Sequence, residues 1–152
     1  MISMNMKFQY NDGGRAAAGY KSRAGDCVCR SIAIITGKPY QEVYEALNGF
    51  VKSKSTGNLT RYRSSARNSI SKRTTKRYLV SLGFEWFPTM FIGQGCKVHV
   101  RAEELPPGHL IVSTSRHITA VIDGVLHDTY DCSRNATRCV YGYYVHGGLR
   151  HD

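Results

Sequence analysis

A helix that begins with a cysteine is predicted by the segment Gly25-Asp-Cys-Val-Cys-Arg-Ser-Ile-Ala-Ile-Ile-Thr-Gly37. Asp26 belongs to the residue types that favour the N-cap of a helix, and Gly37 is typical of the position just after a helix end. Cys27 is therefore expected in the first turn, where free backbone N–H groups and the helix dipole stabilise a thiolate.

The pattern on either side of this segment predicts further helices and then strands. Apolar residues at helical spacing after Pro39 predict a second helix that ends before Gly49, and residues 74–82 predict a third. Alternating patterns then predict strands over 85–92, 97–101, 110–114, 118–122, 125–130 and 139–145. Helices followed by an antiparallel sheet indicate the α+β class, in a single domain over residues 1–152.

The composition excludes several classes of protein. With 41% hydrophobic and 21% charged residues among 152, the chain can form a core and is not wholly disordered. No apolar run approaches the roughly 18 residues that cross a bilayer, and the N-terminus lacks the apolar stretch of a signal peptide. We therefore expect a cytoplasmic protein without membrane contact.

Five cysteines at irregular spacing favour a reducing compartment over a disulfide framework. Four of them are expected to be small apolar residues: Cys29, Cys96, Cys132 and Cys139. The one close pair, Cys27-x-Cys29, has an unusual separation for structural zinc, so no metal and no cofactor are predicted.

Positive charge is concentrated in one part of the chain. Residues 46–84 hold nine basic residues and no acidic one, within a formal net charge of +10 for the whole chain. A Ser-rich and Arg-rich loop or insertion is predicted at about 52–73. Such a segment can bind polyanions such as nucleic acid without sequence specificity. The candidate contacts are Arg61, Arg63, Arg67, Lys72 and Arg73. A mobile, solubilising loop is an equally good interpretation.

A cysteine nucleophile needs a base and a group that orients the base, and His117 and Asp128 meet both needs. If Asp123 and Gly124 form a two-residue turn, Thr119 pairs with Asp128. His117 and Asp128 are then diagonal neighbours on one face of the hairpin, roughly 7–8 Å apart at the backbone.

The sequence leaves alternatives for the partner of His117 and for the nucleophile. A bulge or a longer loop would bring His127 or Tyr130 to the face of His117, and Cys29 is a second candidate nucleophile deeper in the helix. The other histidines have no identifiable partner and are expected to be structural or solvent-exposed: His99, His109, His146 and His151.

The order Cys, His, Asp, with the cysteine at a helix start after Gly-x-Cys, is similar to the papain-like cysteine peptidase superfamily. Three motifs resemble more closely a family of small bacterial and phage proteins of that fold: Gly25-Asp-Cys-Val-Cys-Arg-Ser-Ile-Ala-Ile, Leu105-Pro-Pro-Gly-His-Leu-Ile-Val and His117-Ile-Thr-Ala-Val-Ile-Asp-Gly-Val-Leu-His-Asp128. The resemblance covers nearly the whole chain and implies a papain-like fold with Cys27, His117 and Asp128 as the catalytic triad.

This sequence departs from the superfamily at the residue that assists the oxyanion. Papain-like enzymes commonly place Gln six residues before the nucleophile, and Lys21 stands there in this chain. Lys21 or Ser22 could supplement the backbone N–H of Cys27.

The sequence thus predicts a cysteine peptidase or related thiol hydrolase, or an acyltransferase, that acts on an amide or isopeptide bond of a peptide or protein. The alternative is a module that binds nucleic acid or a partner through residues 52–77, with a vestigial triad. The sequence does not specify the substrate or the oligomeric state.

Overall fold

The structure, a computed structural model, describes residues 6–20, 25–53 and 70–147. The described residues form three α-helices, one 3-10 helix and a six-stranded sheet, an α+β arrangement. In chain order these are β1 (Lys7–Tyr10), α1 (Cys27–Thr36), α2 (Tyr40–Ser53), α3 (Lys72–Ser81), β2 (Phe84–Pro88), η1 (Ala102–Glu104), β3 (His109–Thr114), β4 (His117–Ile122), β5 (Val125–Asp128) and β6 (Val140–His146). None of these helices is long and apolar enough to cross a bilayer.

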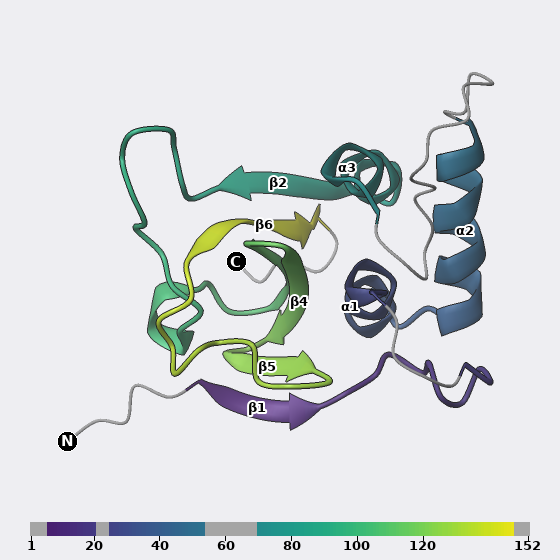
Figure 1. The fold of residues 1–152 in the computed structure, drawn as a ribbon, viewed down its shortest axis with the longest axis horizontal. Coiled ribbons are helices and arrows are strands. Elements are labelled where there is room, and N and C mark those ends of the chain that lie inside the picture. The colour runs from purple at the N-terminus through teal and green to yellow at the C-terminus, as the bar shows by residue number, and fades with distance from the viewer. Residues whose placement is uncertain (1–5, 21–24, 54–69, 148–152) are drawn as a thin grey trace.

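The strands lie in the order β1-β5-β4-β3-β6-β2, and the sheet curves strongly (Figure 1). Strands β2 to β6 pair antiparallel, as predicted, but β1 pairs parallel with β5. The sheet is therefore mixed, and the prediction of a purely antiparallel sheet is wrong at this edge. Polar and aromatic residues do alternate over residues 7–10, but a pattern of four residues at an exposed edge is too short to predict a strand from the sequence.

Two groups of buried side chains lie on the two faces of the sheet. One group packs α1, α2 and α3 against the sheet through residues such as Ile32, Leu47, Leu79 and Ala120. The other fills the inside of the curved sheet and includes Val112, Val121, Leu126 and Val140. Neighbouring residues of β4 thus face different cores, which fixes the face on which each polar side chain of that strand emerges.

Helix α1 begins at Cys27 and ends at Thr36, as the sequence predicts. Gly37 has the left-handed φ of 73° and its N–H donates to the carbonyl of Ala33, which closes the helix. The hydroxyl of Ser31 donates to the carbonyl of Ile118 at 3.1 Å. This bond, together with the packing around it, fixes the start of α1 beside the start of β4.

Three predicted elements differ clearly from the structure. Strand β2 ends at Pro88, four residues before the predicted end at residue 92. Helix α2 passes through Gly49 and continues to Ser53, because the half-buried Phe50 packs against the helix-side core and offsets the modest cost of glycine inside a helix. Residues 97–101 form no regular strand, since only an isolated bridge joins His99 to Cys139.

Two of the cysteines predicted to be small apolar residues are instead joined to each other. Cys96 and Cys139 form a disulfide, with Cα atoms 5.8 Å apart, whereas Cys27, Cys29 and Cys132 are free. The bridge between His99 and Cys139 brings the two cysteines together across 43 residues of sequence. The spacing of the cysteines along the chain does not predict such a long-range contact.

Candidate active site

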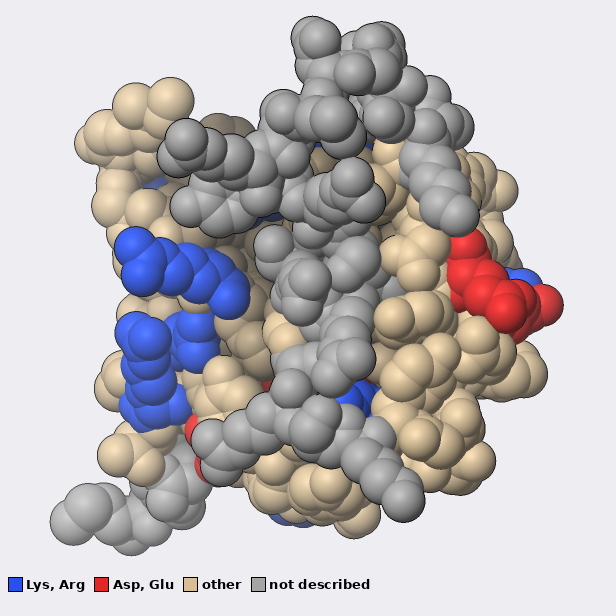
Figure 2. Space-filling model, turned by 45° about the vertical axis from the view of Figure 1, so that its right-hand side comes forward, with Lys and Arg blue, Asp and Glu red and all other residues tan. Residues whose placement is uncertain are grey.

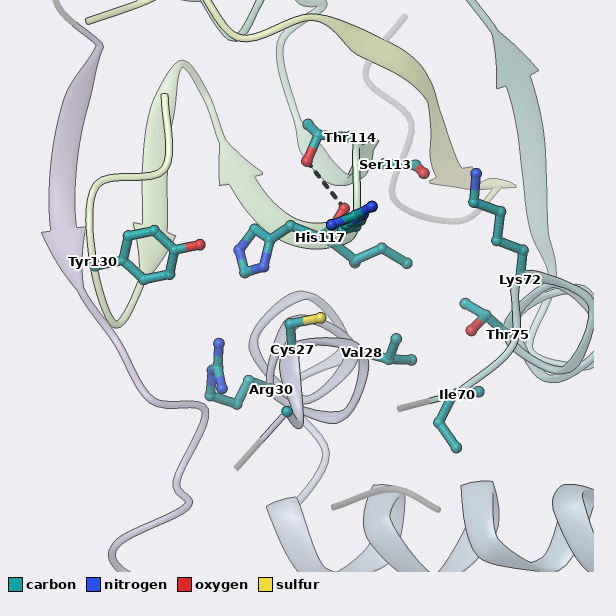
Figure 3. Close-up of a pocket in the computed structure, with 13 residues that line it drawn as sticks. Cys27, Val28, Arg30, Ile70, Lys72, Thr75, Ser113, Thr114, His117 and Tyr130 are labelled. Atoms are coloured by element: carbon teal, nitrogen blue, oxygen red, sulfur yellow. Dashed lines mark hydrogen bonds between the residues drawn. The ribbon is translucent and has the colours of Figure 1, made fainter. Parts of the chain in front are cut away.

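Three predicted site residues from three elements meet at one end of the curved sheet. Cys27 opens α1, His117 opens β4 and Asp128 closes β5. The Nε2 atom of His117 lies 2.7 Å from Oδ2 of Asp128, and the thiol of Cys27 lies beside the same imidazole, in the cavity that both residues line. Figure 3 shows the His117 ring above the Cys27 side chain, at the cavity that both residues line.

The predicted hairpin register is confirmed. Ile122 pairs with Val125 and Ala120 with His127, across a turn in which Asp123 and Gly124 both have positive φ values, 47° and 79°. These values are those of a type I′ turn, which favours Gly at its second position. His117 and Asp128 therefore share a face, and His127 lies on the other one, where its ring contacts Asn11 at 3.3 Å.

The surroundings of Cys27 favour its thiolate. Burial alone would raise the pKa of this thiol, but a hydrogen bond and positive charge from His117 lower it. The backbone N–H of Ile118 and the charge of Arg30 lower it further, so the pKa of Cys27 lies below the ordinary value of a thiol. A thiolate beside an imidazolium is the reactive form of a cysteine nucleophile.

The His117 and Asp128 pair favours charge on both partners. Burial would lower the pKa of His117, but the hydrogen bond that the ring donates to Asp128, together with the neighbouring Cys132 and Cys27 thiols, raises that pKa well above its usual range. Burial would likewise raise the pKa of Asp128, yet its bonds from His117, Thr119 and Thr129 lower that pKa to about 2. The carboxylate thus stays ionised and orients a protonated imidazole.

Asp128 is held by more groups than the sequence indicates. The hydroxyl of Thr119, its predicted cross-strand neighbour, donates to Oδ2 at 2.7 Å. The N–H of Thr129 donates to Oδ1 at 2.7 Å, and the Cys132 thiol lies 3.6 Å from Oδ2. The buried thiol of Cys132 therefore belongs to the site, although its position in an irregular turn gives no periodic signal that would identify it.

The Asp26 side chain, next to Cys27, contacts two arginines and a tyrosine hydroxyl and does not cap the helix. Its side chain makes no capping bond to α1. Instead it pairs with Arg30, lies 3.1 Å from Nε of Arg15, and accepts a 2.5 Å hydrogen bond from the Tyr40 hydroxyl. These partners offset the carboxylate charge that would otherwise oppose a thiolate at Cys27.

Cys29, the alternative nucleophile, is placed where it cannot reach a substrate. Its side chain is fully buried in the helix-side core, and its thiol points to the carbonyl of Tyr40 at 3.8 Å. Burial raises the pKa of this thiol to about 12, so it remains protonated at neutral pH.

A cavity of about 440 Å³ opens over Cys27 and His117. Its lining combines apolar side chains with three cations, and in Figure 3 Val28, Ile70 and Thr75 lie on the side of Cys27 away from Tyr130. The residues that line it are Gly25, Cys27, Val28, Arg30, Ile70, Lys72, Thr75, Ser113, Thr114, Arg116, His117, Ile118 and Tyr130. The volume suits a short side chain or peptide segment rather than a folded domain.

The remaining predicted site residues fall into two groups. Lys21, Ser22, Arg61, Arg63 and Arg67 lie outside the described residues. Lys72 and Arg73 belong to the first turn of α3, which Ser71 caps through a hydrogen bond from the N–H of Thr74. The predicted insertion at 52–73 therefore includes residues of a regular helix, and Lys72 lines the cavity beside Cys27.

A group of described basic side chains lies at the left of the face shown in Figure 2. The largest group of Asp and Glu side chains lies at the right of that face. The Nζ atom of Lys72 also lies 4.9 Å from the centre of the Tyr141 ring, so its charge makes a cation–π interaction there.

Among the described residues, His117, Asp128 and Cys132 bring one possible metal ligand each to within 4.8 Å of one another. Both oxygens of Asp128 already accept short hydrogen bonds, and Nε2 of His117 is one of the partners. This arrangement fits a hydrogen-bonded base and its orienting carboxylate better than a vacant metal centre.

Comparisons of the chain with protein-family models, with curated proteins and with solved structures found no match.

Proposed function

We propose that this protein is a thiol hydrolase or acyltransferase of papain-like fold that acts on an amide or isopeptide bond of a peptide or protein. The observation that carries the proposal is the position of His117, whose ring lies beside the Cys27 thiol at one cavity and is bonded through Nε2 to Asp128 at 2.7 Å. This arrangement supplies a nucleophile, a base and an orienting carboxylate at one cavity.

In the proposed reaction, the Cys27 thiolate attacks the carbonyl carbon and forms a tetrahedral intermediate. The backbone N–H of Cys27 at the helix start is the donor for the developing oxyanion. The imidazolium of His117 then protonates the leaving amine, the C–N bond breaks, and a thioester forms on Cys27.

The second half of the reaction restores the enzyme. Neutral His117 takes a proton from water, or from an acceptor nucleophile in acyl transfer, as that nucleophile attacks the thioester carbonyl. The C–S bond breaks, the acid or acylated product leaves, and the thiolate–imidazolium pair reforms. Asp128 keeps its charge throughout and holds the ring in place. A nucleophilic thiolate has to stay reduced, so we further propose the cytoplasm as its compartment.

The test uses a simple activated ester, p-nitrophenyl acetate, because it needs no knowledge of the natural substrate. Wild type should show a burst of p-nitrophenol followed by slow turnover, since the thioester accumulates. Cys27→Ala and His117→Ala should remove the burst, and His127→Ala is the matched control because His127 lies on the other face of the hairpin. An unchanged burst in Cys27→Ala would refute the proposal.

A further inference from the structure

A second group of chemically active side chains lies at the start of β6, outside the proposed hydrolytic site. Cys96 and Cys139 meet there as a disulfide, and His99 and Glu104 lie beside it. The irregular segment after β2 that carries Cys96 runs on the side of the sheet away from the helices in Figure 1. Cys96 is exposed, so a small molecule can reach it.

The orientation of His99 is set by Glu104. Nδ1 of His99 lies 3.1 Å from Oε1 of Glu104, and the other carboxylate oxygen pairs with Arg101 at 3.1 Å. An ionised carboxylate only accepts hydrogen bonds, so in the neutral ring Nδ1 carries the proton and Nε2 carries the lone pair. A carboxylate that fixes a histidine in this way is the usual outer partner of a metal-binding imidazole.

The lone pair of Nε2 faces a sulfur that cannot donate to it. Nε2 lies 3.7 Å from Sγ of Cys96, and a disulfide sulfur has no proton to give. At a tetrahedral zinc ion, with Zn–S about 2.3 Å and Zn–N about 2.0–2.1 Å, the sulfur and nitrogen ligands are about 3.6 Å apart. The spacing of His99 and Cys96 therefore matches that of two ligands on one ion.

We propose that Cys96, Cys139 and His99 bind one Zn²⁺ when the disulfide is reduced, with Glu104 orienting His99. Two molecules of a small thiol reduce the Cys96–Cys139 bond and leave as their own disulfide, which gives two protein thiols. Zn²⁺ then replaces both thiol protons, forms two Zn–S bonds and one Zn–N bond, and keeps water as its fourth ligand. The same three residues thus hold either a disulfide or a metal ion.

Either state ties the irregular segment before η1 to the start of β6. The disulfide does so covalently, and His99 pairs with Cys139 through the backbone bridge in the same place. A metal ion would keep this connection in a reducing compartment, where the disulfide is lost. The site is independent of the proposed function, because it uses none of the groups around Cys27.

The test measures metal binding with Zn²⁺ and with Co²⁺, whose thiolate complexes absorb in the near ultraviolet. The protein carries Cys27→Ser, so that the thiol in the cavity cannot contribute. After reduction and removal of the reductant, one equivalent of Co²⁺ should give thiolate-to-metal absorption, and Zn²⁺ should displace it. The same protein with its disulfide intact should give none, and this comparison needs no further substitution.

Single variants assign the ligands. Cys96→Ser and Cys139→Ser should abolish tight binding, and Glu104→Gln should weaken it by about 10- to 100-fold, as loss of an outer-shell partner does. Met90→Leu is the matched control, because its thioether lies 3.7 Å from the Cys139 sulfur but is a poor zinc ligand. The proposal is overturned if the reduced protein binds no metal, if the oxidised protein binds it equally, or if Cys139→Ser keeps full affinity.

Discussion

Arg30 reaches Asp128, the carboxylate bonded to His117, from the helix that begins at Cys27. Its Nη2 atom lies 3.4 Å from Oδ1 of Asp128, while Nη1 pairs with Asp26. All three side chains are nearly or fully buried. One guanidinium therefore connects α1 to β5, so the distance between Cys27 and Asp128 depends on a buried ionic contact.

Replacing Arg30 by Met should destabilise the fold strongly. The substitution leaves Asp26 with only Arg15 as a cation and removes the cation beside Asp128. Breaking a buried ion pair in this way costs about 3–5 kcal/mol, because a charge stays buried without its partner. Urea unfolding of wild type and Arg30→Met at pH 7 measures the difference.

Lys38→Met is the matched control for Arg30→Met. Lys38 pairs with Glu42 at 3.6 Å, but both side chains are more than a third exposed. Water screens such a pair, so its loss should change the free energy of unfolding by less than about 1 kcal/mol. Equal effects of the two substitutions would show that the buried network does not hold α1 to β5.

Asp128→Asn should raise the pKa of the Cys27 thiol. The substitution removes the negative charge that favours protonated His117, and that imidazolium in turn lowers the thiol pKa. Each unit of increase lowers the thiolate fraction at acid pH by about tenfold. The pH profile of Cys27 alkylation by iodoacetamide should therefore move to higher pH.

Asp131→Asn provides the control for the carboxylate. Asp131 is exposed and accepts hydrogen bonds from the backbone and hydroxyl of Ser133. Its substitution should leave the alkylation profile of Cys27 unchanged. If both variants shift the profile equally, the role assigned to Asp128 is mistaken.

Asp128 should also make stability depend on acid pH. Its folded pKa of about 2 lies below the value of about 3.9 for an unfolded chain, so its contribution is fully present above pH 5. That contribution, about 2 kcal/mol, should disappear as the pH falls towards 2. The stability difference between wild type and Asp128→Asn, measured by urea unfolding, should shrink by this amount; a constant difference from pH 7 to pH 2.5 would contradict the assignment.

The close contact of Gly142 with Trp86 gives a test of the fold itself. A Cβ atom at Gly142 would lie 2.4 Å from two atoms of the Trp86 ring and 2.8 Å from the carbonyl of Phe87. Gly142→Ala should therefore cost about 1–3 kcal/mol of stability, as overpacking does. Gly147→Ala, where nothing lies within 4 Å, should cost much less in the same thermal unfolding experiment.

Local sequence signals are sufficient to predict the elements that hold Cys27, His117 and Asp128. Asp123 and Gly124 specify a two-residue turn, and the turn then fixes which residues of β4 and β5 share a face. Gly37 specifies the end of α1 in the same way. The arrangement of His117 and Asp128 on one face followed from these short-range rules.

Long-range contacts were not accessible to the same reasoning. The partners of Asp26 include Arg15 and Tyr40, which tertiary packing brings to it. The disulfide and the exposed strand β1 also depend on contacts between distant parts of the chain. The hydrophobic periodicity of a segment predicts which of its faces is buried, but it does not identify the distant segment that packs against that face.

The most direct test of the account is the identity of the thiol that reacts first with limiting iodoacetamide at pH 6.5, without added reductant. Three thiols are free, and only Cys27 combines partial exposure with a lowered pKa. Peptide mapping should find the label at Cys27, and His117→Ala should slow that labelling while His127→Ala leaves it unchanged. Labelling of Cys29 or Cys132 before Cys27, or labelling of Cys27 that does not depend on His117, would contradict the account.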